Sequence, residues 1–165
     1  MAIRFTMNRQ KATEAVLWII QRGEPNPYNI LKILFSAEKY HLNHYGRPIT
    51  GDRYIAMEHG TVPSAIYDDI KNGRNPDYFK EGELLKATRA PSTDYFSDTD
   101  MEALEFGFSE YAGKPFDDVK NRNHLEPAWI KAFENNPNSG IAFEDMIEED
   151  WLRRDLETTA PSIVL

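Results

Sequence analysis

Apolar residues in the first 45 positions recur at the three- and four-residue spacing of two amphipathic helices. In residues 8–22 the apolar positions are Ala12, Ala15, Val16, Ile19 and Ile20, and a Gly-x-Pro signal follows them. A second pattern runs from about Pro27 to Tyr45. We expect one of its faces to be solvated, the face of Lys32, Ser36, Lys39 and Asn43. The opposite face is apolar and holds Ile30, Leu34, Ala37, His41 and Tyr45.

A carboxylate and an imidazole lie on or beside this apolar face, at Glu38 and His41. A catalytic or metal-binding pair would need further convergent ligands, which the sequence does not identify. A structural pair needs only a hydrogen-bond partner for each buried polar group. We therefore predict that both side chains are buried and make structural hydrogen bonds.

Turn-forming residues interrupt the helical pattern over residues 46–64. The stretch 54–57 suits a short strand, and Ser64 is expected to cap the next helix. The turn formers are Pro48, Gly51, Gly60 and Pro63. Nothing here has the spacing of a nucleophile with its base, a phosphate-binding loop or a metal cluster.

A second strand is predicted at residues 84–88, where it would pair with residues 54–57 and satisfy the backbone groups of both. Residues 73–82 are expected to form a loop. Further helices are predicted at 64–72, from Ser97 with an Asp100 capping box, at 116–121, from Pro127, and at 142–157 with Trp151 facing inward. The pattern predicts a mainly α (α+β) fold, a helical domain with a small antiparallel sheet of two or three strands. We expect Leu34, Tyr54, Leu104 and Trp129 to share one core.

Composition narrows the classes of function. The 165 residues suit a single domain over 1–165, and 27 acidic against 19 basic residues give a formal charge of −8. This charge disfavours nucleic acid as the main partner. The absence of cysteine excludes disulfides and thiolate chemistry, and no apolar run approaches the length of a membrane span. We expect a cytoplasmic protein without a cofactor or a resident metal.

Three segments together resemble a known family. The stretch GRPITGDRYIAMEHGTVPS is similar to GxPITGDxYxAMxxGPVPS, and ILKILFSAEKYHLNHYG is similar to KLLYFADxYHLxxYG. Downstream, FSDTDMEALEFGFSEYAG and NRNHLEPAW resemble a serine-capped helix and an HxxxAW signature. These are motifs of the Panacea domain, also called the SocA-like antitoxin or phage-associated GepA-like domain, and the resemblance is strongest over residues 8–133. One departure is Thr61, which replaces the first proline of GPVPS and is expected to loosen the turn.

The resemblance implies structural rather than catalytic roles for the motif residues. They are Glu38, His41, Gly46, Pro48, Gly51, Asp52, Tyr54, Met57, Gly60, Pro63, Ser64, His124 and Trp129. For His124 we expect a helix-capping or backbone-bonding role, because no nucleophile motif accompanies it.

The resemblance also implies a function, that of an antitoxin that neutralises a co-encoded toxin by direct binding and is not an enzyme. The toxin would be a protein such as an alarmone-synthetase-like, tRNA-modifying enzyme. Residues 142–165 form an acidic helix and tail in which Glu144, Asp145, Glu148 and Glu149 are candidates for binding a basic toxin surface. The alternatives are a DNA-binding regulator of its own operon and an adaptor that delivers a toxin to a protease.

Overall fold

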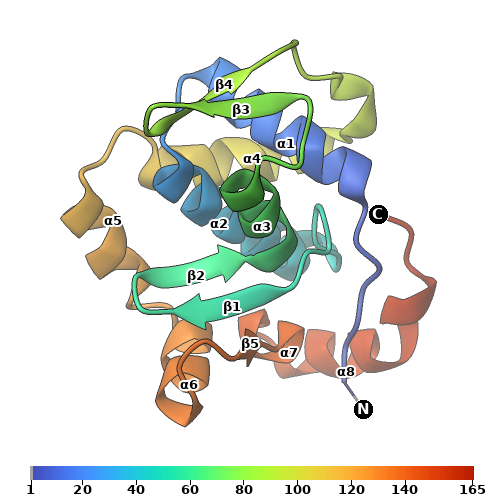
Figure 1. Cartoon of the computed structure of the whole chain (residues 1–165). Helices are drawn as coiled ribbons and strands as arrows, with labels where there is room; N and C mark the ends of the chain where they lie inside the picture. The colour runs from blue at the N-terminus through green and yellow to red at the C-terminus, as the bar shows by residue number, and fades with distance from the viewer. Residues whose placement is uncertain (1) are drawn as a thin grey trace.

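The computed structural model describes residues 2–165 and consists mainly of helices around one central helix (Figure 1). The helices are α1 (Arg9–Arg22), α2 (Pro27–Tyr45), α3 (Ser64–Asn72), α4 (Asp98–Tyr111), α5 (Phe116–Asn123), α6 (Pro127–Asn135), α7 (Phe143–Met146) and α8 (Asp150–Thr159), with 3-10 turns η1 (Thr93–Tyr95) and η2 (Ala160–Ser162). The strands are β1 (Tyr54–Met57), β2 (Gly60–Pro63), β3 (Tyr78–Glu81), β4 (Leu84–Ala87) and β5 (Gly140–Ile141). The predicted fold class, mainly α with small antiparallel sheets, is confirmed.

Helix α2 lies at the centre of the molecule and is covered on nearly all sides (Figure 1). Its largest interface is with α4, while β2 and α5 cover the face that contains Lys32. Lys32 is 1% exposed and Ser36 is also buried. The prediction that this face is solvated was therefore wrong, because later segments of the chain cover polar positions that periodicity assigns to solvent.

The buried apolar residues form two clusters, and α2 contributes side chains to both. Leu34 packs with Leu104 in the cluster shared with α1, α3 and α4. Tyr54 packs with Phe35 in the cluster shared with α6, α7 and α8, and Trp129 lies at its edge. The expectation of one common core was wrong. Successive residues of a helix point in different directions, so Leu34 and Phe35 of the buried α2 belong to different clusters.

The strands form two separate antiparallel sheets. The predicted strand at residues 54–57 is confirmed as β1, but it pairs with β2 and with β5, in the order β2-β1-β5. Residues 60–63, predicted as a turn, are therefore a strand. The segment at 84–87 is a strand but pairs with β3, which lies within the predicted loop 73–82. In each sheet a two-residue loop joins consecutive strands, so β1 pairs with β2 and β4 pairs with β3. The predicted pairing of β1 with β4 was therefore wrong.

The helix signals downstream are largely confirmed. Ser97 and Asp100 make both hydrogen bonds of a capping box at the start of α4, and Pro127 occupies the first turn of α6. The predicted helix at 142–157 is instead two helices. Residues 147–149 leave the helical conformation, and the Arg153 guanidinium donates to the carbonyls of Glu144 and Ile147 at the end of α7. Trp151, predicted to face inward, is 61% exposed.

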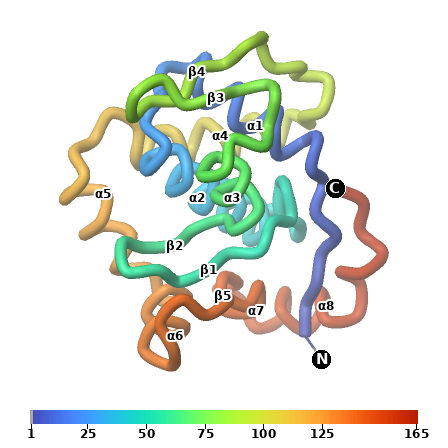
Figure 2. Tube along the Cα trace, viewed as in Figure 1, coloured from blue at the N-terminus to red at the C-terminus, as the bar shows by residue number. Residues whose placement is uncertain are grey.

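The two end segments of the described chain run side by side (Figures 1 and 2). The Asn8 side-chain amide donates to the carbonyl oxygen of Leu165 over 3.1 Å. A side chain at Gly51 would collide with Leu165 and with the backbone at Thr6. The tail 158–165 therefore packs against the loop that follows α2.

Helices α2 and α4 approach closely at Gly107, where an added Cβ would lie 2.5 Å from the Ile33 carbonyl oxygen. Alanine normally stabilises a helix by about 1 kcal/mol relative to glycine. Here we expect Gly107→Ala to destabilise the protein by about 1–3 kcal/mol, because the two helices must separate. Urea denaturation measures this, with Ser109→Ala on the exposed face of α4 as the control. A stabilised Gly107→Ala variant would contradict the close approach.

Candidate functional site

Glu38 holds the loop between α2 and β1. The carboxylate is fully buried and accepts hydrogen bonds from the backbone N–H of Ile49 (3.0 Å) and of Thr50 (2.9 Å), and from the Thr50 hydroxyl. Burial raises the pKa of Glu38 to about 7, although the bonds from Thr50 act in the opposite direction. Glu38 therefore satisfies backbone N–H groups of a loop that has no helix or strand to bond them.

His41 belongs to a buried charged cluster centred on Asp100. Its Nδ1 is 2.7 Å from the Arg47 carbonyl oxygen, and its Nε2 is 2.9 Å from the Thr99 hydroxyl and 3.5 Å from Asp100 Oδ1. Asp100 also contacts Lys11 Nζ at 2.8 Å and Arg47 at 2.9 Å. Burial alone would raise the pKa of Asp100, but the bonds from Arg47 and Lys11 outweigh it and hold the pKa at about 2. Burial lowers the pKa of His41.

This cluster joins α1, α2, α4 and the loop at Arg47, and the sequence analysis identified only two of its members. Asp100 was assigned to a capping box and Lys11 was not singled out. The burial of Lys11 could have been suspected from the sequence, because this residue lies next to the apolar stripe of the first helix.

Two glycines and an aspartate shape the loop after α2. Gly46 ends the helix in the left-handed conformation, with φ 77°, and Gly51 also has φ 77°. Pro48 is buried between them. The Asp52 carboxylate accepts from the N–H groups of Ala65 and Ile66, each over 3.1 Å. The cap of α3 is thus Asp52, and the prediction that Ser64 supplies it was wrong.

Three side chains bind consecutive carbonyls at the tip of the β1–β2 hairpin. Trp129 Nε1 donates to Met57 O (2.8 Å), His124 Nε2 lies 2.9 Å from Glu58 O, and the Tyr28 hydroxyl donates to His59 O (2.6 Å). The rings of His124 and Trp129 stack at 4.0 Å. The geometry places His124 on backbone, in the way the sequence analysis expected.

The remaining motif residues of the hairpin are packed against buried groups. Tyr54 is 1% exposed, its ring meets Phe35 edge to face, and its hydroxyl has no hydrogen-bond partner in the described chain. A side chain at Gly60 would overlap Asn123, and Pro63 with Ser64 forms the junction of β2 and α3.

Thr61 does not loosen the hairpin. It is fully buried in β2, where its N–H donates to Asn123 Oδ1 (2.7 Å) and its hydroxyl accepts from Asn123 Nδ2 (3.1 Å). Proline has no N–H to make the first of these bonds. The expectation of a looser turn was wrong, because threonine supplies two hydrogen bonds to α5.

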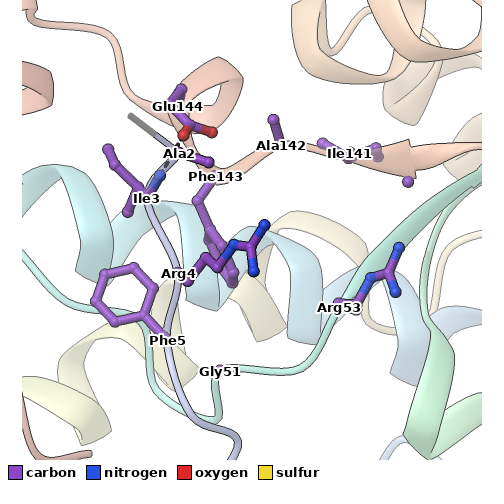
Figure 3. A pocket seen from close by; sticks show the side chains of 11 residues that line it. Ala2, Ile3, Arg4, Phe5, Gly51, Arg53, Ile141, Ala142, Phe143 and Glu144 are labelled. Atoms are coloured by element: carbon purple, nitrogen blue, oxygen red, sulfur yellow. Dashed lines mark hydrogen bonds between the residues drawn. The ribbon is translucent and has the colours of Figure 1, made fainter. Parts of the chain in front are cut away.

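The four acidic candidates for partner binding lie in different environments. Glu144 is half-buried and accepts a hydrogen bond from the backbone N–H of Ile3, beside a cavity of about 470 Å³ (Figure 3). Asp145 pairs with Lys131 at 2.8 Å. Glu148 and Glu149 are exposed, and Glu148 lies 3.4 Å from Lys39. The latter two are thus the more accessible.

The polar groups of the motif residues are already engaged in hydrogen bonds within the protein. Glu38, His41, Asp52 and His124 all bind backbone or neighbouring side chains. Across residues 2–165, no group of three or more His, Cys, Asp or Glu is arranged to hold a metal ion. In the same residues, every helix is too short or too polar to cross a membrane. The motif residues therefore organise the fold around α2.

Replacing His41 with alanine removes two hydrogen-bond partners from the interior. We expect His41→Ala to lower the free energy of unfolding by about 1–3 kcal/mol, because Arg47 O and Thr99 Oγ1 lose their buried partner. His44→Ala, on the exposed side of α2, is the matched control and should cost less than about 0.5 kcal/mol. Equal melting temperatures for His41→Ala and the parent protein would contradict this role.

The raised pKa of Glu38 predicts a dependence of stability on pH. Between about pH 4.5 and 7 the folded state retains a proton that the unfolded chain has released, so this contribution to stability is present at low pH and is lost as pH rises through 7. We expect the stability of the parent protein relative to Glu38→Gln to fall by up to about 3 kcal/mol across this window. Urea titrations of both proteins from pH 4.5 to 7.5 measure the difference, and a constant difference would contradict the prediction.

A comparison with protein-family models identifies the family of this chain. The protein-family model described as "Antitoxin SocA-like, Panacea domain" matches residues 30–130, from α2 into α6. Neither the comparison with curated proteins nor that with solved structures gives a match. The matched segment contains Glu38, His41, the β1–β2 hairpin, His124 and Trp129. The chain therefore belongs to the SocA-like antitoxin family with a Panacea domain.

Proposed function

We propose that this protein is an antitoxin that neutralises a co-encoded protein toxin by direct binding, without catalysis, in the cytoplasm. The observation that carries the proposal is the family match over residues 30–130. The motif residues support a binding mode of action, because their polar groups are engaged in holding loops and strands to α2. We propose that residues 1–165 act as one domain and that an alarmone-synthetase-like, tRNA-modifying enzyme is a fitting toxin.

The exposed start of α8 is our proposed contact surface. Glu148 and Glu149 are followed by Asp150 and by Trp151, whose ring is largely in solvent. Tryptophan is enriched among residues that dominate binding energy, and carboxylates around it favour a basic partner. A toxin that binds RNA presents such a basic surface. Glu144 and Asp145 have partners within the chain and belong to the edge of this surface.

A matched pair of triple variants tests the surface. We expect Glu148→Gln/Glu149→Gln/Trp151→Ala to fold but to bind the toxin at least about tenfold more weakly, because it loses a central aromatic and two charges. The control Glu81→Gln/Glu83→Gln/Phe79→Ala likewise removes two carboxylates and one exposed aromatic ring, here on the β3–β4 hairpin, where Phe79 is 47% exposed. Calorimetry on the purified pair and rescue of growth on co-expression give the two readouts.

The ratio of antitoxin to toxin distinguishes binding from the alternatives. Neutralisation by binding requires stoichiometric amounts and a complex that co-purifies. Rescue by trace amounts without a complex would contradict direct binding. A shift of the upstream DNA by the antitoxin alone would favour an operon regulator, and a toxin half-life that shortens only when a protease is present would favour an adaptor.

A further inference from the structure

Lys32 is the one buried charged side chain of the described chain that lacks a partner. The other buried charged groups all have one. Lys11 contacts Asp100, Glu14 contacts Arg89, Glu24 accepts from Gly113 and Asn29, Glu38 accepts from Thr50, and Asp52 accepts from Ile66. Lys32 is 1% exposed, and within residues 2–165 its Nζ makes no hydrogen bond or ion pair and lies 4.3 Å from the centre of the Tyr28 ring. A buried ammonium without an acceptor is unfavourable, so the position calls for an explanation.

The side chain of Lys32 ends at the wall of a cavity of about 530 Å³. The cavity lies between the hairpin tip, the start of α2, α3 and the end of α6. Its apolar wall is formed by Leu31, Met57, Val62, Tyr67 and Phe133. Cavities of this size and character hold small organic ligands, in which a few polar groups fix the orientation.

The surrounding residues hold the lysine in this position. The carbon stem passes Gly60, where an added Cβ would lie 2.9 Å from Lys32 Cε and would overlap Asn123 Oδ1, so the lysine and the hairpin are closely packed here. Tyr28 is fixed by its hydrogen bond to His59 O, and its ring packs on Phe116. The Lys32 ammonium is therefore held over the face of the Tyr28 ring. This cation–π contact stabilises the charge less than an ion pair would.

We propose that this cavity binds an anion carried on an apolar body, a carboxylate whose charge pairs with Lys32 Nζ while its hydrocarbon part fills the apolar wall. A free small-molecule acid and a carboxylate at the end of a protein partner present the same chemistry. The proposal goes beyond the antitoxin function and does not rest on it. Burial lowers the pKa of Lys32 to about 7, and a bound carboxylate would restore the charged form.

The other titratable groups at the cavity are Glu58, His59, Tyr28 and Tyr67. Glu58 and His59 are exposed, and His124 lies behind the hairpin tip on Glu58 O. None of them forms an ion pair with Lys32. A carboxylate that enters the cavity thus meets one buried cation.

Binding of 4-phenylbutyrate and of its neutral analogue 4-phenylbutyramide tests the proposal. Amide NMR titrations at pH 6.5 should show the carboxylate binding at least about tenfold more tightly than the amide, with shifts at Met57, Val62 and Phe133. Lys32→Met keeps the apolar stem and should bind both compounds equally. Lys80→Met, on exposed β3, should retain the preference. Equal binding in the parent protein, binding of neither compound, or a preference that survives in Lys32→Met would overturn the proposal.

A second measurement needs no substitution and so does not depend on a variant that folds. In protein labelled with ¹³C-lysine, saturating 4-phenylbutyrate should raise the pKa observed at Lys32 Cε, whereas the amide should not. An unchanged pKa would overturn the proposal. Competition then identifies the source of the natural carboxylate. A toxin displaced by 4-phenylbutyrate supports a carboxylate of the partner, and a toxin that binds together with it supports a small-molecule acid.

Discussion

Helix α2 is buried on nearly all sides, and this burial determines which contacts the surrounding segments must make. A helix with 19 residues in the centre of a small protein buries many of its polar side chains, although those near its end, such as His44, remain exposed. Each buried polar group then requires a partner from another part of the chain, because an unmet group costs about 1–3 kcal/mol. Glu38 meets this requirement with the backbone at residues 49 and 50, and His41 meets it with Arg47 O and Thr99.

These contacts explain how segments without regular structure are held in place. The loop after α2 is fixed by Glu38, the start of α3 is fixed by Asp52, and the hairpin tip is fixed by Trp129, His124 and Tyr28. Each anchor bonds to backbone groups of a turn, a loop or a helix start. The motif residues of this chain are thus mainly internal anchors.

The outer surface and the Lys32 cavity are chemically different. The start of α8 is acidic and open, with an exposed indole, and suits a protein surface of opposite charge. The cavity is apolar and contains a single cation at the end of a fixed side chain. The two proposals therefore assign ligands of different chemistry to the two regions. A ligand in the cavity would also contact the hairpin tip, which is held by residues of α2, α5 and α6.

Most of the local elements could be predicted from the order of residues along the chain. The spacing of apolar residues placed α1 and α2, the Ser97 and Asp100 pair placed the start of α4, and the run at residues 54–57 placed β1. It also placed Glu38 and His41 toward the interior, because a helical period of 3.6 residues decides which side chains share a face. The motif residues were sufficient to identify the family.

Which segments contact one another could not be predicted from the sequence and is seen only in the folded chain. Strand β1 pairs with β2 and β5 rather than with β4, and the helix predicted at the end of the chain breaks at residues 147–149. Lys32 lies on a face that periodicity assigns to solvent, and only β2 and α5 make that face an interior one. Periodicity describes one element at a time. The partner of a strand and the cover of a helix face depend on contacts between residues far apart in the sequence, which no local pattern contains.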